Sequence, residues 1–136
     1  MILLDTGVLS AVLRRRRRGD REARLAAQVT KLLESDEEIA LPGIVFQEIL
    51  SGIAEPAHFE KVLGSVRESF PIVLATEGDH EEAAKLANTA ARRGVAVSAP
   101  DVLIAAQAVR VGATLFTVDS DFVRIASFAG QRLRAS

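Results

Sequence analysis

Short runs of apolar residues alternate along this chain with longer segments in which apolar residues recur every three or four positions. Runs of the first kind predict buried strands, because every side chain of such a strand lies against other parts of the protein. They lie at residues 2–4, 38–41, 71–75 and 113–117. A last edge strand is expected at residues 131–133.

The longer segments predict helices. One of them begins near Asp20, which can cap it, and carries apolar residues at helical spacing: Leu25, Val29, Leu32 and Leu33. Proline near the start and glycine at the end mark several others. The remaining predicted helices are a brief one ending at Leu13, longer ones at about 44–53, 56–70, 78–93 and 99–111, and a short one at 122–128.

This order of elements predicts the α/β class. Strands that alternate with helices pair in parallel through right-handed crossovers, with helices on both faces of the sheet. We therefore expect a three-layer α/β/α sandwich around a central, mainly parallel sheet of four to five strands, in one domain that covers residues 1–136. In such sheets the functional site lies beyond the carboxyl ends of the strands.

Four acidic residues lie beside apolar segments: Asp5, Glu48, Asp101 and Asp119. Asp5 and Asp119 each follow a predicted strand directly, which places both at the carboxyl edge of the sheet. Helical spacing groups Glu48 with Ile44 and Gly52, on the face expected to contact the protein. Carboxylates in such places are unfavourable unless something compensates their charge.

The predicted helix at 99–111 carries Asp101 in its first turn. Helical spacing places Asp101 and Val109 on or beside the inward face, and Gln107 and Arg110 on the exposed face. Asp101 is therefore expected to point into the protein from the start of this helix.

Each acid also has a structural interpretation when it is taken alone. Asp5 and Asp119 can cap the helices that follow them, and Asp101 stands three residues after Ser98, the spacing of a capping box. For Glu48, no cap and no cation four residues away offers such an interpretation. Taken together, the four favour one shared site. Like charges about 4 Å apart repel by roughly 4 kcal/mol at an effective dielectric of 20, so a cluster needs protons or a cation.

The available ligands narrow the choice of cation. The chain has no cysteine, and its two histidines, His58 and His80, stand alone on predicted helices. Only carboxylate oxygens are then left to bind the ion, and these favour Mg²⁺ or Mn²⁺ over zinc.

A formal net charge of −1 gives no overall basic field, so a polyanion would need a local patch. The run Arg14, Arg15, Arg16, Arg17 and Arg18 is one candidate, with two interpretations left open: a solvated loop, or a contact for RNA phosphates. No apolar stretch reaches the roughly 18 residues of a membrane span, and the amino terminus lacks the pattern of a signal peptide. We expect a cytoplasmic protein with no membrane contact.

Four motifs resemble the PIN-domain nucleases, and especially the VapC-like toxins of toxin–antitoxin pairs. They are Leu4-Asp5-Thr6, Gln47-Glu48-Ile49, Ala99-Pro100-Asp101-Val102-Leu103-Ile104-Ala105-Ala106, and the segment from Gly112 to Phe122. The likeness covers residues 2 to about 128, and the last two motifs are the most specific. Carried over by position, it implies that Asp5, Glu48, Asp101 and Asp119 form a catalytic, metal-binding quartet, with Asp5 and Asp101 as the principal ligands.

The same resemblance implies supporting roles for other residues near the acids. Thr6 and Thr117 would give local hydroxyl support, and Asp121 would be an accessory acid. Gly7 departs from the family pattern, because many relatives carry Asn or Ser at that position.

The implied activity is Mg²⁺-dependent hydrolysis of RNA phosphodiester bonds, with Mn²⁺ as a substitute. One or two ions would bind the scissile phosphate, help to deprotonate a water molecule and stabilise the leaving 3′ oxygen. The implied partners are an RNA substrate, a cognate antitoxin and a second copy of the toxin. The resemblance suggests that the antitoxin would bind an exposed apolar groove, and one open interpretation assigns to it Phe59, Val62, Leu63 and Val66. The other interpretation is that these residues pack in the core.

Three alternatives compete with this interpretation. A haloacid-dehalogenase-like phosphatase needs a second Asp two residues after Asp5, where this chain has Gly7. A phospho-accepting receiver domain needs an Asp at the end of the third strand, which here ends with Thr76. A PIN fold that binds RNA or protein without catalysis stays open, although the presence of all four acids counts against it.

Overall fold

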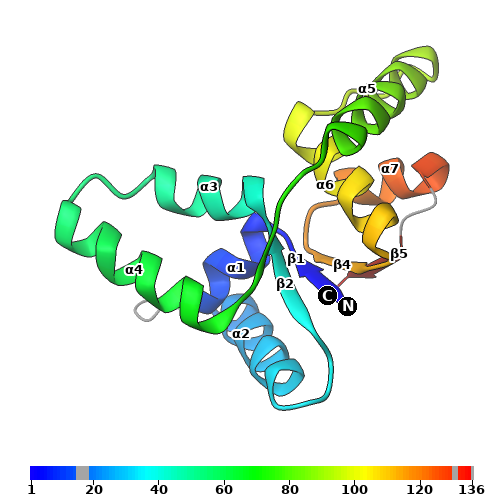
Figure 1. The fold of residues 1–136 in the computed structure, drawn as a ribbon. Helices are drawn as coiled ribbons and strands as arrows, with labels where there is room; N and C mark the ends of the chain where they lie inside the picture. The colour runs from blue at the N-terminus through cyan, green and yellow to red at the C-terminus, as the bar shows by residue number, and fades with distance from the viewer. Residues whose placement is uncertain (15–18, 130–131, 136) are drawn as a thin grey trace.

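Within the residues that the structure describes, 1–14, 19–129 and 132–135, the central sheet has five strands, all paired in parallel (Figure 1). Their bounds in this computed structural model are β1 (Ile2–Leu4), β2 (Ile39–Pro42), β3 (Ile72–Val73), β4 (Thr114–Thr117) and β5 (Arg132–Ala135). The predicted strands are therefore confirmed, with bounds that differ by at most two residues at either end.

Helices connect these strands. They are α1 (Thr6–Leu13), α2 (Asp20–Leu33), α3 (Gly43–Ser51), α4 (Pro56–Ser69), α5 (Glu77–Arg92), α6 (Ala99–Val111) and α7 (Asp121–Ala129). The prediction that Asp20 caps α2 is wrong: Gly19 is the N-cap residue, and Asp20 is already helical. The carboxylate of Asp20 still lies at the positive end of the helix dipole, so the sequence located the start of α2 correctly. Leu33, predicted on the apolar face of α2, is 45% exposed.

The strand order β3-β2-β1-β4-β5 reverses between β1 and β4. From β1 the chain moves outward through β2 to β3, crosses back to β4 on the other side of β1, and then reaches β5. With right-handed crossovers, the helices of the first two connections cover one face of the sheet and those of the last two cover the other. In Figure 1, α1 to α4 accordingly lie on one side and α5 to α7 on the other. The predicted α/β/α sandwich is confirmed.

The core is centred on the two strands at this reversal. Leu3, Leu4, Leu115 and Phe116 are fully buried, as expected for strands covered on both faces. Burial of each side chain of this size contributes about 1.5–3 kcal/mol. The ends of β1 and β4 are thereby fixed by tight packing. None of the helices in the described part of the chain has the length and apolar character of a membrane span.

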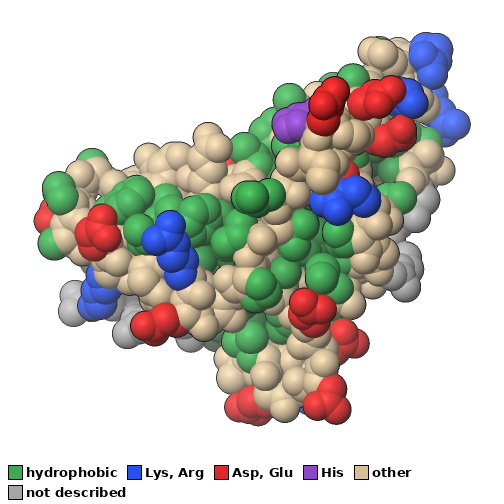
Figure 2. All heavy atoms as spheres, in the orientation of Figure 1, with side chains coloured by type: hydrophobic (Ala, Val, Ile, Leu, Met, Phe, Trp, Pro, Cys, Tyr) green, Lys and Arg blue, Asp and Glu red, His purple; other side chains and the backbone are tan. Residues whose placement is uncertain are grey.

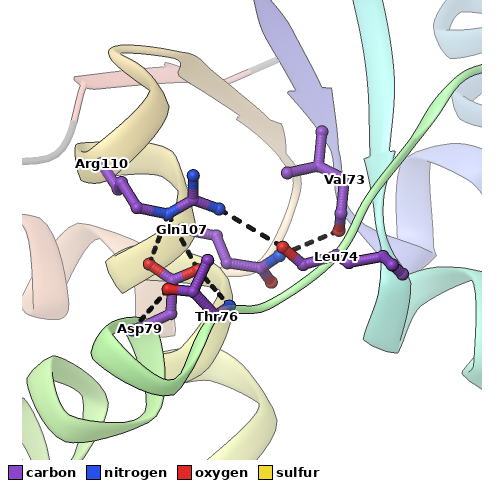
Figure 3. Close-up of polar contacts among 6 residues, drawn as sticks. All are labelled: Val73, Leu74, Thr76, Asp79, Gln107 and Arg110. Carbon is purple, nitrogen blue, oxygen red and sulfur yellow. Dashed lines mark hydrogen bonds and ion pairs between the residues drawn. The ribbon is translucent and has the colours of Figure 1, made fainter.

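The orientation of α6 differs from its prediction at two positions. Gln107, expected on the exposed face, is fully buried, and Val109, expected beside the inward face, is 48% exposed. The reason is a hydrogen bond: Nε2 of Gln107 donates to the backbone carbonyl of Val73 at 2.9 Å (Figure 3). Val73 belongs to β3, an edge strand, and edge strands carry carbonyls that need partners from outside the sheet. A buried amide that satisfies such a carbonyl is favourable.

Arg110 and Asp79 tie α6 to the start of α5 (Figure 3). Nε of Arg110 donates to both carboxylate oxygens of Asp79, at 2.8 and 3.0 Å, and Nη2 donates to the carbonyl of Leu74 at 3.3 Å. Asp79 also forms a capping box with Thr76. Burial alone would raise the pKa of Asp79, but the hydrogen bonds from Arg110 and Thr76 outweigh it and lower the pKa. This carboxylate is therefore charged in the folded protein.

Replacing Asp79 with Ala is expected to lower the free energy of unfolding by about 2 kcal/mol, because it removes one of the two hydrogen bonds of the capping box and the carboxylate that pairs with Arg110. The lowered pKa stabilises the fold above the ordinary pKa of Asp, and this contribution is lost as the pH falls through the folded-state pKa. The D79A variant should therefore lose less stability than the wild type on acidification. Chemical denaturation at several pH values measures both effects.

Lys85→Ala is the control for this prediction. Lys85 forms two exposed ion pairs, with Glu81 and Glu82, and their removal should change stability little. Equal stability of D79A and K85A, or the same loss on acidification in D79A and the wild type, would contradict the role of Asp79.

Candidate metal centre

Asp5 lies at the reversal of strand order, directly after β1. Its backbone N–H donates to the carbonyl of Phe116 at 3.1 Å, which extends the pairing of β1 with β4. Its side chain caps α1: Oδ1 accepts the N–H of Val8 at 2.9 Å. The other oxygen, Oδ2, accepts a hydrogen bond from the hydroxyl of Thr117. Because Asp5 is only 4% exposed, the surrounding protein fixes both oxygens.

Thr117 links the two acids that follow the central strands. It is the last residue of β4 and is 1% exposed. Its Oγ1 accepts the N–H of Asp119 at 2.9 Å while donating its proton to Asp5. Asp119 in turn accepts the N–H of Asp121 through Oδ1, also at 2.9 Å. One buried hydroxyl therefore sets the positions of Asp5 and Asp119 together.

Asp101 comes from the other side of the sheet, in the first turn of α6. Ser98 is the N-cap residue of this helix, and its Oγ accepts the N–H of Asp101 at 3.2 Å. Pro100 lies in the same turn, where its missing N–H has no helical partner to lose. The Asp101 side chain is half-buried. The cap thus fixes the first turn of α6 at the site.

Glu48 lies in α3 and is exposed, which corrects the prediction that it is turned into the protein. The face of α3 that carries it borders an open cavity instead of packed side chains. Helical spacing identified the correct face of α3, but it could not show whether that face contacts packed side chains or an open cavity.

A cavity of about 330 Å³ brings the predicted quartet together. Asp5, Glu48, Asp101 and Asp119 all line it, from α3, the first turn of α6 and the ends of β1 and β4. The other residues of its lining are Thr6, Gly7, Ile104, Val118 and Phe122. Thr6, predicted to support the acids, is therefore also at the cavity.

The environment of Asp5 favours its protonated form. Burial is the main cause of a raised pKa, and the negative charge of Asp119 adds to it. The hydrogen bonds from Thr117 and Val8 act in the opposite direction without cancelling the increase.

Asp101 is affected in the same way. Burial again raises its pKa most, a hydrogen bond with Ser98 opposes this, and the charges of Asp119, Asp121 and Glu48 raise the pKa further. The influence of Glu48 on Asp101 indicates that the two carboxylates interact across the cavity. Mutual repulsion of this kind is relieved when a cation binds.

Three carboxylates lie close enough to share one ion. Among the described residues, one oxygen each of Asp101, Asp119 and Asp121 lies within 4.8 Å of the others. Ligands on opposite sides of one Mg²⁺, with bonds of about 2.1 Å, stand about 4.2 Å apart, so small rotations of these side chains would fit such an ion. Asp5 is outside this group of three, although it lines the same cavity. Its role as a principal ligand stays a prediction.

Two arginines next to the cavity are absent from the sequence-predicted site. Arg124, in α7, forms an ion pair with Asp121. Arg21, in the first turn of α2, donates from Nη2 to the carbonyl of Val118 at 3.5 Å. Because Arg21 precedes the buried Leu25 by four residues, helical spacing would have placed it on the inward face of α2.

The predicted basic run is described only in part. Arg14 is exposed and forms an ion pair with Glu22 at 3.6 Å. Arg15, Arg16, Arg17 and Arg18 lie outside the described residues, so their contact with RNA stays a prediction.

The family model of the PIN domain matches residues 2–127 of this chain. The chain therefore belongs to the PIN domain family, which confirms the resemblance found in its sequence motifs. No curated protein matches the chain.

Several solved structures share the fold. A chain of FitAcB from Neisseria gonorrhoeae is 26% identical, with 98% of this chain and 96% of that chain covered and a TM-score of 0.79. VapBC2 from Rickettsia felis, bound to a DNA fragment from its promoter, gives 21% identity, 100% and 99% coverage and a TM-score of 0.77. A toxin–antitoxin complex from Klebsiella pneumoniae gives 24% identity, 90% coverage of both chains and a TM-score of 0.66.

Replacing Asp101 with Asn is expected to raise the melting temperature of the metal-free protein at neutral pH. A raised pKa means that the charged carboxylate destabilises the fold above the folded-state pKa. This gain over the wild type should shrink as the pH falls through the raised pKa and vanish below the ordinary value of 3.8. Thermal unfolding in the presence of EDTA measures it, and a lower melting temperature for D101N at pH 7 would count against the proposed repulsion.

Addition of Mn²⁺ should stabilise the wild type and not D101N. An ion present at 100 times its dissociation constant stabilises the folded state by about 2.7 kcal/mol. Glu68→Gln, on the exposed surface of α4, removes one negative charge away from the cavity and is the matched control. Similar Mn²⁺-induced shifts in all three proteins would mean that the ion binds elsewhere.

Proposed function

We propose that this protein is a Mg²⁺- or Mn²⁺-dependent endoribonuclease that acts as the toxin of a toxin–antitoxin pair. The observation that carries the proposal is the convergence of Asp5, Glu48, Asp101 and Asp119 on one cavity of a PIN domain. Structural metal sites are closed by protein ligands, whereas an ion that acts on a substrate needs an open position. The exposure of Glu48 supports an open site.

Each acid of the cavity has a separate role in this proposal. Asp101, Asp119 and Asp121 would hold the ion, and Asp5, whose carboxylate accepts a hydrogen bond from Thr117, would be a further acid at the same cavity. Glu48, on the solvent side of the cavity, orients the water that attacks the phosphate. When bound, Mg²⁺ or Mn²⁺ lowers the pKa of water and offsets the charge of the phosphate and of the leaving oxygen. No side-chain nucleophile is required.

A cation held by the acids would suit the negative charge of a phosphodiester, and the family resemblance makes RNA the proposed substrate. Without a cation the acids would repel a phosphate, so binding of the ion and binding of the substrate are coupled. The chain has neither Trp nor Tyr, which argues against recognition of bases by aromatic stacking. Contacts with the sugar–phosphate backbone are therefore the main source of affinity in this proposal.

A cognate antitoxin and a second copy of the chain are the proposed protein partners. Figure 2 shows hydrophobic side chains gathered over α3 and α4. Phe59, Val62 and Leu63 of α4 are partly buried, which suits a face that a partner covers. Val66, placed in the same groove by the sequence, is fully buried and belongs to the core. The toxin–antitoxin complex from Klebsiella pneumoniae, with its similar fold, supports a partner of this kind.

The purified protein is expected to cleave RNA with Mg²⁺ or Mn²⁺ and to lose this activity in EDTA. Asp101→Asn should lower the rate by at least about 100-fold, since loss of a residue that merely supports a ligand already costs 10- to 100-fold. Gel analysis of a single-stranded RNA with a labelled 5′ end measures the rate. Internal cleavage products would distinguish an endonuclease from an exonuclease.

Glu68→Gln serves as the control here too and should cleave at the wild-type rate. Cleavage by D101N at the wild-type rate would exclude Asp101 as a ligand. A wild-type protein that binds RNA but does not cut it with any divalent cation would favour the inert binding module instead.

A further inference from the structure

A second, smaller cavity adjoins the metal centre. Its volume is about 180 Å³, and it shares Gly7 and Val118 with the cavity of the four acids. Among the residues that the structure describes, its charged lining consists of Arg14, Arg21 and Glu22. An acidic cavity that holds a dication therefore lies directly beside a cavity that carries two guanidinium groups.

Arg21 is placed at this boundary by the fold. Its side chain is exposed, in the first turn of α2 and four residues before the buried Leu25, and it lines the smaller cavity. Nη2 donates to the carbonyl of Val118, the residue before Asp119, at 3.5 Å. This distance is at the outer limit of a hydrogen bond, and the contact uses one of five N–H donors of the guanidinium. Arg21 thus has the capacity to bind an anion without losing a strong contact.

Arg14 lines the same cavity from the end of α1 and pairs with Glu22 at 3.6 Å. The two side chains are 55% and 32% exposed. Ion pairs in such positions contribute little to stability. Arginine also matches the geometry of a phosphate through paired N–H donors.

Gly7 separates the two cavities without a side chain. It is exposed, and a Cβ atom at this position would lie 3.1 Å from Cγ2 of Val118. The glycine permits α1 to approach the end of β4 closely, and it places no side chain where the two cavities meet. This packing gives a physical reason for the departure from the family's Asn or Ser at this position.

We infer that Arg21, together with Arg14, binds the RNA phosphate next to the scissile one, with the RNA backbone crossing from the metal centre over Gly7. The inference rests on the proposed nuclease function and adds a subsite to it. The cation at the acids would hold the scissile phosphate, and the guanidinium groups would hold its neighbour. Two neighbouring phosphates of the RNA would then each contact a positive group, although the whole chain has a formal net charge of −1.

The test replaces single phosphates of a short, single-stranded RNA with neutral methylphosphonates and measures kcat/KM for wild type and Arg21→Gln. In the wild type, neutralising one phosphate beside the cleaved bond should lower kcat/KM about tenfold, the effect of one charge-assisted hydrogen bond. R21Q should already cleave unmodified RNA more slowly, and neutralising that phosphate should then cost less than in the wild type, because only the contact with Arg14 is left to lose. Arg21→Lys, which keeps the charge, should recover part of the rate.

Arg24→Gln is the matched control, because Arg24 is an exposed arginine on the same helix that lines neither cavity. It should cleave like the wild type and remain sensitive to the same methylphosphonate. The inference is overturned if R21Q cleaves like R24Q, or if R21Q keeps the wild-type sensitivity at every position. Melting temperatures of R21Q and R24Q that agree would exclude a merely structural effect at Val118.

Failure of the nuclease proposal gives a different result, since the wild type would then cut no RNA at all. In that case binding of the same RNA, followed by fluorescence anisotropy across a salt series with Mg²⁺ present, tests the subsite directly. Loss of one phosphate contact should reduce the slope of log K against log salt by about 0.7 for a single strand. An unchanged slope in R21Q would overturn the inference.

Discussion

Mutual repulsion among carboxylates at the reversal of strand order is the constraint around which this structure is organised. β1 and β4 lie side by side at that point, so the residues that follow them, Asp5 and Asp119, necessarily approach each other. Asp101 and Glu48 are added from helices on opposite faces of the sheet. Burial raises the pKa values of Asp5 and Asp101 most, and the charges of the neighbouring acids raise them further. Such an arrangement lowers stability without a ligand and is typical of a functional site.

Helix capping and metal binding are compatible roles for these acids. Asp5 caps α1, Asp119 accepts the N–H of Asp121 before α7, and Asp101 lies in the capped first turn of α6. Each helix terminus supplies N–H donors that hold a carboxylate or its backbone in place. Capping therefore orients the acids before any ion arrives. Helix capping and metal binding are alternatives when each acid is considered alone, but in the structure the same acids can do both.

Much of this site could be predicted from the sequence because it depends on chain order. Strand ends locate Asp5 and Asp119, and helical spacing identifies the faces that carry Glu48 and Asp101. What the sequence could not reveal depends on neighbours from distant segments. Glu48 borders a cavity instead of packed side chains, and Gln107 is buried because an edge-strand carbonyl needs its amide. The anchoring of α6 by Arg110 is likewise a contact between distant residues.

The central claim is that the acidic cavity holds a hard divalent cation, and anomalous X-ray scattering from crystals soaked in Mn²⁺ tests it most directly. The account predicts an anomalous peak in bonding contact with Asp101 and Asp119, inside the cavity that Asp5 and Glu48 also line. An ordered cavity without such a peak, at an Mn²⁺ concentration that saturates binding in solution, would contradict it.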